Sequence, residues 1–150
     1  MTEKIKVFVY GTLRTGEGNW KYFLKDNPNV EKLDDDKIHG YVMIHLGGFP
    51  AIIPVESYYS ENELPIFDED CGEFLLNHPI VGEVFEVDSL TLRRLDGLEG
   101  YNGNGSGLYD RKKVFTEKNH KAYVYFMNEP RKNRPVIENG DWIRSGGKKW

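Results

Sequence analysis

Residues 80–100 constrain the fold of this chain more than any other stretch, because they join a strand pattern to a helix pattern. Apolar and polar residues alternate from Ile80 to Val87, which is typical of a β-strand. Asp88 or Ser89 can cap the helix that follows, and Gly100 is a natural stop near its end at Glu99. Four leucines fall near one face of this predicted helix: Leu90, Leu92, Leu95 and Leu98. We therefore expect one main helix with an apolar face.

Most of the other segments with a regular residue pattern are predicted to be β-strands. The expected strands are Ile5–Val9, Val30–Leu33, Ile38–Leu46, Phe49–Val55, Tyr109–Thr116 and Lys121–Met127. The last two form a hairpin, and the prolines that bracket 49–55 place that strand at an edge or beside a bulge. A short helix is expected at Trp20–Leu24 with Asn19 as its cap, and Asp34–Lys37 is expected to be a solvated turn. This order predicts an α+β fold with a mostly antiparallel sheet or barrel.

Length and composition favour one ordinary domain. The chain has 150 residues, of which 39% are hydrophobic and 29% charged, so it can bury a core. We expect a single domain over residues 1–150, with an acidic excursion at about 56–79 and a basic tail at about 143–150. Its net charge of −4 argues against a general nucleic-acid binder.

The expected compartment is the cytoplasm. No apolar run approaches the ~20 residues that span a membrane, and the first residues offer no apolar signal region. Cys71, the single cysteine, cannot form an internal disulfide. The four histidines are scattered without the paired spacing of a zinc site, so we expect no metal.

The junction after the first strand is the first candidate site. The apolar pattern stops at Tyr10, and Gly11, Thr12 and Leu13 follow in a glycine turn. A strand that ends in such a turn presents backbone N–H groups that can hold an anionic or carbonyl oxygen. The alternative is a plain turn that binds nothing.

The second candidate lies at the end of the predicted helix. Asp96 and Glu99 are three residues apart and therefore share a helix face. Glu99 sits where the helix dipole disfavours a negative charge, and apolar surroundings would raise its pKa further, which suits proton transfer. The alternative is a surface helix end with two solvated carboxylates.

Together these stretches resemble the γ-glutamylcyclotransferase-like (AIG2-like) family, in particular its γ-glutamylamine cyclotransferases. The matching segments keep the order of the family: Tyr10–Arg14, Gly48–Ile52, Gly82–Val87, Leu95–Tyr101, Tyr109–Val114 and Gly140–Trp142. The resemblance implies a small, mostly antiparallel β-barrel with one main helix and short flanking helices. It also implies a pocket between the Tyr10–Leu13 loop and Glu99.

The resemblance further implies a reaction that requires no cofactor. In this family the α-amine of a γ-glutamyl amine or γ-glutamyl amino acid attacks its own γ-carbonyl, releasing 5-oxoproline and a free amine or amino acid. Glu99 is then the expected catalytic residue. The expected substrate-binding residues are Tyr10, Gly11, Thr12, Leu13, Tyr109, Arg111 and Tyr125.

Three points stay open in the sequence. Arg111 is also suited to a structural ion pair. Trp20 stands where relatives often carry a polar residue, and both the 56–79 excursion and the 103–107 loop depart from the family pattern, which leaves the substrate undetermined. A small-ligand binding protein or an interaction module on the same fold is the alternative function, although a pure binder has no need for Glu99.

Overall fold

The computed structural model describes residues 4–55, 79–101, 109–127, 136–137 and 140–143. Two helices and seven strands are described: β1 (Ile5–Val9), α1 (Gly18–Phe23), β2 (Glu31–Ile38), β3 (Tyr41–His45), β4 (Pro50–Pro54), β5 (Ile80–Val87), α4 (Ser89–Glu99), β6 (Asp110–Phe115) and β7 (Lys121–Phe126). The predicted single domain over 1–150 stays a prediction, since its acidic excursion and basic tail lie almost entirely outside the described residues. Among the residues described, no helix is long and apolar enough to cross a membrane.

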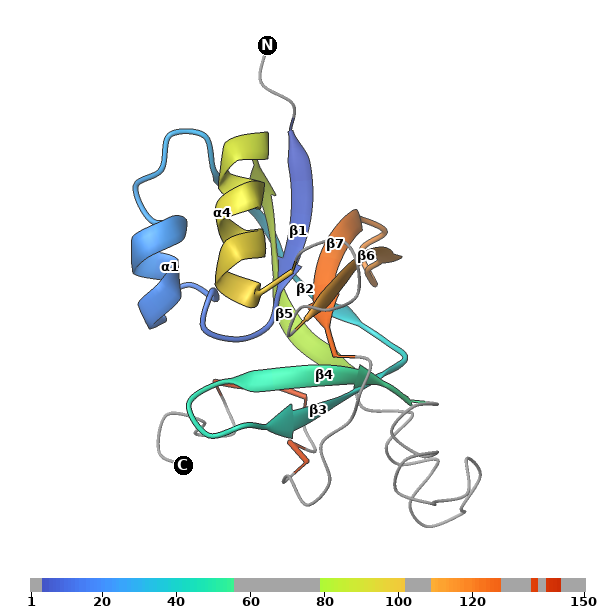
Figure 1. Cartoon of the computed structure of the whole chain (residues 1–150). Coiled ribbons are helices and arrows are strands. Elements are labelled where there is room, and N and C mark those ends of the chain that lie inside the picture. The colour runs from blue at the N-terminus through green and yellow to red at the C-terminus, as the bar shows by residue number, and fades with distance from the viewer. Residues whose placement is uncertain (1–3, 56–78, 102–108, 128–135, 138–139, 144–150) are drawn as a thin grey trace, which may run out of the picture.

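The strands form one five-stranded sheet and one separate hairpin (Figure 1). The large sheet has the order β2-β5-β1-β7-β6, and the hairpin is β3-β4. Neighbouring strands are antiparallel except β1 and β7, which pair in parallel at Val7 and Tyr123. The expected α+β, mostly antiparallel fold is therefore confirmed. The expected barrel closure is wrong for the described strands, because β3 and β4 pair with each other and leave β2 and β6 as the edges of an open sheet.

The edge strand β2 corrects the prediction of a turn at Asp34–Lys37. These residues continue the strand and pair with β5 as far as Ile38 and Ile80. The turn between β6 and β7 supplies hydrogen-bond partners for two of the aspartates: His120 Nε2 lies 2.5 Å from Asp34 Oδ2, and the backbone N–H of Lys118 donates to Asp36 at 3.2 Å. Polar residues are tolerated on this edge because their partners come from the hairpin turn.

A glycine divides the segment predicted as one strand from 38 to 46. Gly40 has a φ of +93°, a conformation that favours glycine, and it separates β2 from β3. The proline-bracketed segment is confirmed as the edge strand β4, which pairs with β3 alone among the described strands. Both strands that flank the 116–120 turn are also confirmed as the antiparallel hairpin β6–β7.

Helix α4 has the predicted ends. The Asp88 carboxylate accepts a hydrogen bond from the Thr91 N–H at 3.0 Å, and Gly100 ends the helix in the left-handed conformation. Leu92 and Leu95 are buried, but Leu90 and Leu98 are exposed, which corrects the predicted four-leucine face. Leu90 lies about 200° around the helix from Leu92, so it cannot share the buried stripe.

Helix α1 begins before the predicted cap. It runs from Gly18, with Glu17 at the N-cap position, instead of starting after Asn19. The Asn19 side chain donates to Thr12 Oγ1 at 2.7 Å and is therefore tied to the loop after β1.

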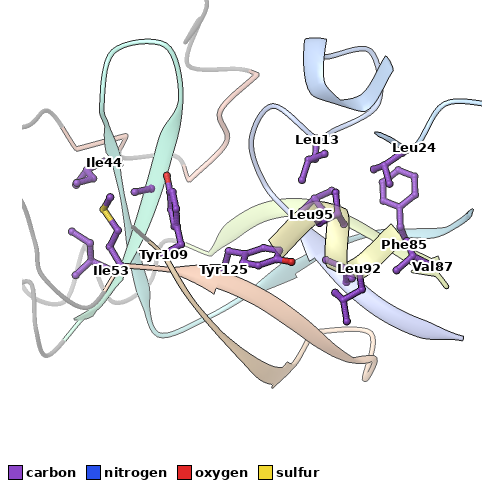
Figure 2. Packing of buried hydrophobic residues seen from close by; sticks show 14 of the residues in the cluster. Leu13, Leu24, Ile44, Ile53, Phe85, Val87, Leu92, Leu95, Tyr109 and Tyr125 are labelled. Carbon is purple, nitrogen blue, oxygen red and sulfur yellow. The ribbon is translucent and has the colours of Figure 1, made fainter. Parts of the chain in front are cut away.

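Apolar side chains cover both faces of the large sheet. On one face Leu92 and Leu95 of α4 pack with Phe85 and Val87 of β5, as Figure 2 shows. The other face has its own cluster, which includes the fully buried Trp142. Burial on both faces holds the end of β1 in place, and the residues of the candidate site follow directly from that end.

Candidate active site

A cavity of about 300 Å³ lies where the end of β1, the segment before β4 and the C-terminal end of α4 meet. Its lining includes most of the residues predicted for the site, namely Tyr10, Gly11, Thr12, Leu13, Glu99, Tyr109 and Tyr125. Arg111 was expected there too, but it is absent from this lining. The fold therefore brings together two stretches that lie almost ninety residues apart in sequence.

Glu99 is the last residue of α4 and faces this cavity. Burial of its carboxylate among protein atoms raises its pKa from 4.5 to about 7, as its apolar setting leads one to expect. Within the described residues no lysine, arginine or histidine lies within ion-pairing distance of it. A carboxyl group with a pKa near neutral pH can both accept and return a proton.

Asp96 has a different environment although it lies on the same helix. Arg111 Nη1 donates to both of its carboxylate oxygens, at 2.8 and 2.7 Å, and the Tyr125 hydroxyl donates to Oδ1 at 2.6 Å. The Arg111 guanidinium stacks between the rings of Tyr101 and Tyr123, at 4.6 and 4.3 Å from their centroids. Arg111 thus forms the structural ion pair that the sequence left open, and of the two carboxylates Glu99 is the one beside the cavity.

Three tyrosines of the cavity each use their hydroxyl proton within the protein. Tyr10 donates to the backbone carbonyl of Tyr125 at 2.7 Å, and Tyr109 donates to that of Pro50 at 2.9 Å. Tyr125 donates to Asp96. Burial raises the pKa of both Tyr10 and Tyr125, so both hydroxyls stay protonated at neutral pH. Because each phenol has one proton, these oxygens can offer only lone pairs to a ligand.

The loop after β1 is held by a buried charge network. Arg14 donates to Glu83 at 3.1 Å and to Asp141 at 2.8 Å, and the Thr15 hydroxyl donates to Glu83 at 2.5 Å. Burial opposes the ionisation of Glu83, but the hydrogen bonds from Thr15 and Arg14 outweigh it and hold the pKa of Glu83 below its usual range. The loop therefore has a fixed geometry before any ligand binds.

Gly11 allows this loop to lie against β4. A Cβ atom at position 11 would be 2.8 Å from Cγ of Pro50, closer than real Cβ contacts. Among the described residues, no hydrogen-bond acceptor is found for the backbone N–H groups of Gly11, Thr12 and Leu13. Both features leave backbone donors at the cavity wall, as the sequence predicts for a strand that ends in a glycine turn.

Several lining residues were not predicted as site residues. Asn19 was interpreted as a helix cap, and Leu98 as part of the buried helix face. Phe49 and Pro50 stand in a segment that matches the family pattern, but their sequence alone gave them no role. Phe49 and Leu98 are 39% and 38% exposed, so the cavity has an apolar rim. Within the described part of the chain, no three histidine, cysteine or acidic side chains are close enough to hold a metal ion.

Residues 7–144 match the family model described as gamma-glutamyl cyclotransferase, AIG2-like. The chain belongs to this family. It is 35% identical over 140 residues to a putative gamma-glutamylcyclotransferase of Methanocaldococcus jannaschii, covering 91% of this chain and 93% of the relative. The solution structure of protein ytfP from Escherichia coli superposes with a TM-score of 0.59 at 27% identity, covering 93% and 96% of the two chains.

A third relative has a named substrate. The gamma-L-glutamyl-butirosin B gamma-glutamyl cyclotransferase of Niallia circulans is 34% identical over 107 residues, which cover 70% of this chain and 53% of that protein. The family and the names of these relatives point to γ-glutamylcyclotransferase activity, the enzyme class that the motifs predict.

Proposed function

We propose that the protein cyclises a small γ-glutamyl compound and releases 5-oxoproline together with an amine or amino acid. The observation that carries this proposal is the position of Glu99, whose burial at the cavity wall brings its pKa to about 7. Family membership supports the reaction class. The reaction as proposed uses neither a metal ion nor an organic cofactor.

The proposed chemistry begins with the α-amine of the substrate. This group is mostly protonated at neutral pH and cannot attack until it loses a proton, which the Glu99 carboxylate accepts. The freed nitrogen attacks the γ-carbonyl carbon and forms the five-membered ring. The bond from that carbon to the leaving nitrogen then breaks as Glu99 gives its proton to the leaving nitrogen. Glu99 next takes the second proton of the ring nitrogen, which leaves the neutral lactam, and passes it to the released amine or to water, which restores the carboxylate. Because attack is intramolecular, the main task of the cavity is to hold the substrate in the reactive conformation.

The polar groups of the cavity support one orientation of the substrate. The oxygens of Tyr10 and Tyr125 and the Glu99 carboxylate are acceptors, which suits the α-ammonium group. The N–H groups of Gly11 to Leu13 are donors, which suits the α-carboxylate or the oxyanion that develops on the γ-carbonyl. Both acceptors and donors line the cavity, which suits a substrate that carries an ammonium group as well as a carboxylate.

The test is release of 5-oxoproline from a panel of γ-glutamyl amines and γ-glutamyl amino acids. We expect turnover of at least one member and a loss of about 10²–10⁴-fold in Glu99→Gln, the range that general acid–base catalysis contributes. Glu31→Gln is the matched control, because it makes the same change at an exposed position of β2. Turnover that persists in Glu99→Gln would show that Glu99 is not the group that transfers the proton. Binding without turnover across the panel would favour a small-ligand binding protein.

A further inference from the structure

A second cavity, larger than the candidate active site, lies among α4, β1, β6 and β7. Its volume is about 520 Å³, and it shares no lining residue with the first cavity. Six of its lining residues are basic: Lys4, Lys6, Arg93, Arg111, Lys113 and Lys121. These residues come from four elements and from the segment before β1, so the fold and not a local basic run gathers them. The proposed reaction has no use for this cavity.

The positive charge of this basic cavity is only partly balanced. Its two acidic lining residues are already paired, since Glu86 lies 3.6 Å from Lys4 Nζ and Asp96 binds Arg111. Within the described residues, no carboxylate lies within 4.0 Å of the charged groups of Arg93, Lys113 and Lys121. Lys6 also has no carboxylate at that distance, although its Nζ lies 3.1 Å from His120 Nδ1. On a chain with a net charge of −4, four cations without a carboxylate partner around one cavity form an attractive site for an anion.

Two of the basic residues that line the cavity, Arg111 and Lys113, lie against the ring of Tyr123. Arg111 Cζ lies 4.3 Å and Lys113 Nζ lies 5.1 Å from the centroid of that ring. Arg111 is further fixed by the hydrogen bonds that its Nη1 donates to both carboxylate oxygens of Asp96. Cations that are held against an aromatic ring lose less conformational entropy when a ligand binds than freely moving lysines do.

We propose that the basic cavity binds a small multivalent oxyanion of the phosphate or polyphosphate class. Several ligand charges are needed because a single charge competes poorly with salt at this open site. Arginine and lysine donors match the oxygens of a phosphate group. The basic residues surround a cavity and do not form an extended stripe, which favours a small ligand over a nucleic-acid backbone. The phosphate groups can belong to an inorganic polyphosphate or to an organic metabolite.

Isothermal titration calorimetry tests this proposal with the full chain at constant, near-physiological ionic strength. One arm uses inorganic tripolyphosphate and the other uses ATP without magnesium, so their relative affinities identify the inorganic or organic source. The double variant Arg93→Gln, Lys113→Gln removes two of the unbalanced charges. The control, Lys21→Gln with Lys112→Gln, removes the same charge at exposed positions outside the lining. Lys112 is adjacent to Lys113 in β6, but its Nζ lies over the rings of Tyr41 and Phe126.

We expect at least one probe to bind the wild type, and its affinity to fall about tenfold or more in the cavity variant, equivalent to about 1.4 kcal/mol. The control should remain within about twofold of the wild type. Absence of binding by both probes, or equal weakening in the two double variants, overturns the proposal. The titration is repeated in Glu99→Gln, where binding should persist. Failure of this inference and failure of the proposed reaction are therefore distinguishable.

Discussion

Replacing Glu99 with glutamine should stabilise the folded protein, by an amount that depends on pH. The folded chain holds this carboxyl group at a pKa of about 7, whereas its ordinary value is 4.5. Between these two pH values the folded chain retains a proton that the unfolded chain has lost, so the free energy of unfolding falls as pH rises. Below pH 4.5 the Glu99 carboxyl group is protonated in both the folded and the unfolded chain, so no charge is buried on folding. Glutamine at this position is uncharged at every pH and therefore avoids this destabilisation.

The size of the effect follows from the two pKa values. Their difference of about 2.5 corresponds to about 3 kcal/mol at 1.36 kcal/mol per pKa unit. For a chain of 150 residues this is an increase in Tm of about 6–12 °C. The gain should be close to zero below pH 4.5, grow between pH 4.5 and 7, and level off above pH 7.

The assay is thermal unfolding, followed by circular dichroism, of the wild type, Glu99→Gln and the exposed control Glu31→Gln over a series of pH values. The expected gain belongs to Glu99→Gln alone. A difference between Glu99→Gln and wild type that stays constant with pH would refute the reasoning. So would a difference that turns in favour of the wild type as pH rises, because that result would mean that the folded state favours the Glu99 carboxylate.

Four further outcomes follow from the same structure. The kcat/KM of the proposed reaction should rise as pH increases through about 7, because Glu99 loses its proton there and can act as the base. A fall in kcat/KM over that pH range would exclude Glu99 as the base. Gly82→Ala should lower the free energy of unfolding, measured with urea, by about 3 kcal/mol or more, because the added Cβ would lie 2.3 Å from a backbone oxygen of β1. Gly97→Ala in α4 should raise that free energy by up to ~1 kcal/mol, because the added Cβ has no neighbour within 4 Å and alanine favours the helix. Tyr125→Phe removes an acceptor for the α-ammonium, so steady-state kinetics should show kcat/KM lower by about 10–100-fold; an unchanged value would remove this residue from the proposed ammonium contact. Asp141→Ala removes the contact with Arg14 that holds one side of the loop after β1, so it should lower the free energy of unfolding by about 1–3 kcal/mol and raise KM. An unchanged KM would mean that the loop does not need this contact.

Local signals in the sequence were sufficient for the parts of the fold that local interactions determine. Helix α4 has its cap at Asp88 and its stop at Gly100 because both depend on residues within one turn of the helix ends. Strand β5 was also predicted with the right bounds, and it pairs on both sides and is largely buried. A raised pKa of Glu99 was predicted only on the condition of apolar surroundings, and burial is what raises it in the folded chain.

Features that depend on distant partners were not predictable. The run Asp34–Asp36 resembles a turn, and only the hairpin turn that holds Lys118 and His120 makes it suitable for a strand. Barrel closure was an expectation of the resemblance, and strand pairing between distant segments decided against it. The sequence placed Glu99 near the glycine turn only through the family resemblance. It could not show where the hydroxyl proton of Tyr125 points, because the acceptor is chosen by tertiary packing.

The contact between Arg14 and Asp141 also bears on when the site can form during synthesis. It joins positions 127 residues apart, so it closes one of the longest loops in the chain. A nascent chain that ends before Asp141 already contains all of the described residues that line the candidate active site, but one anchor of the glycine turn is still missing. Contacts of such sequence separation form late in folding. The turn after β1 can therefore be locked by this contact only once Asp141 has been synthesised and can reach Arg14.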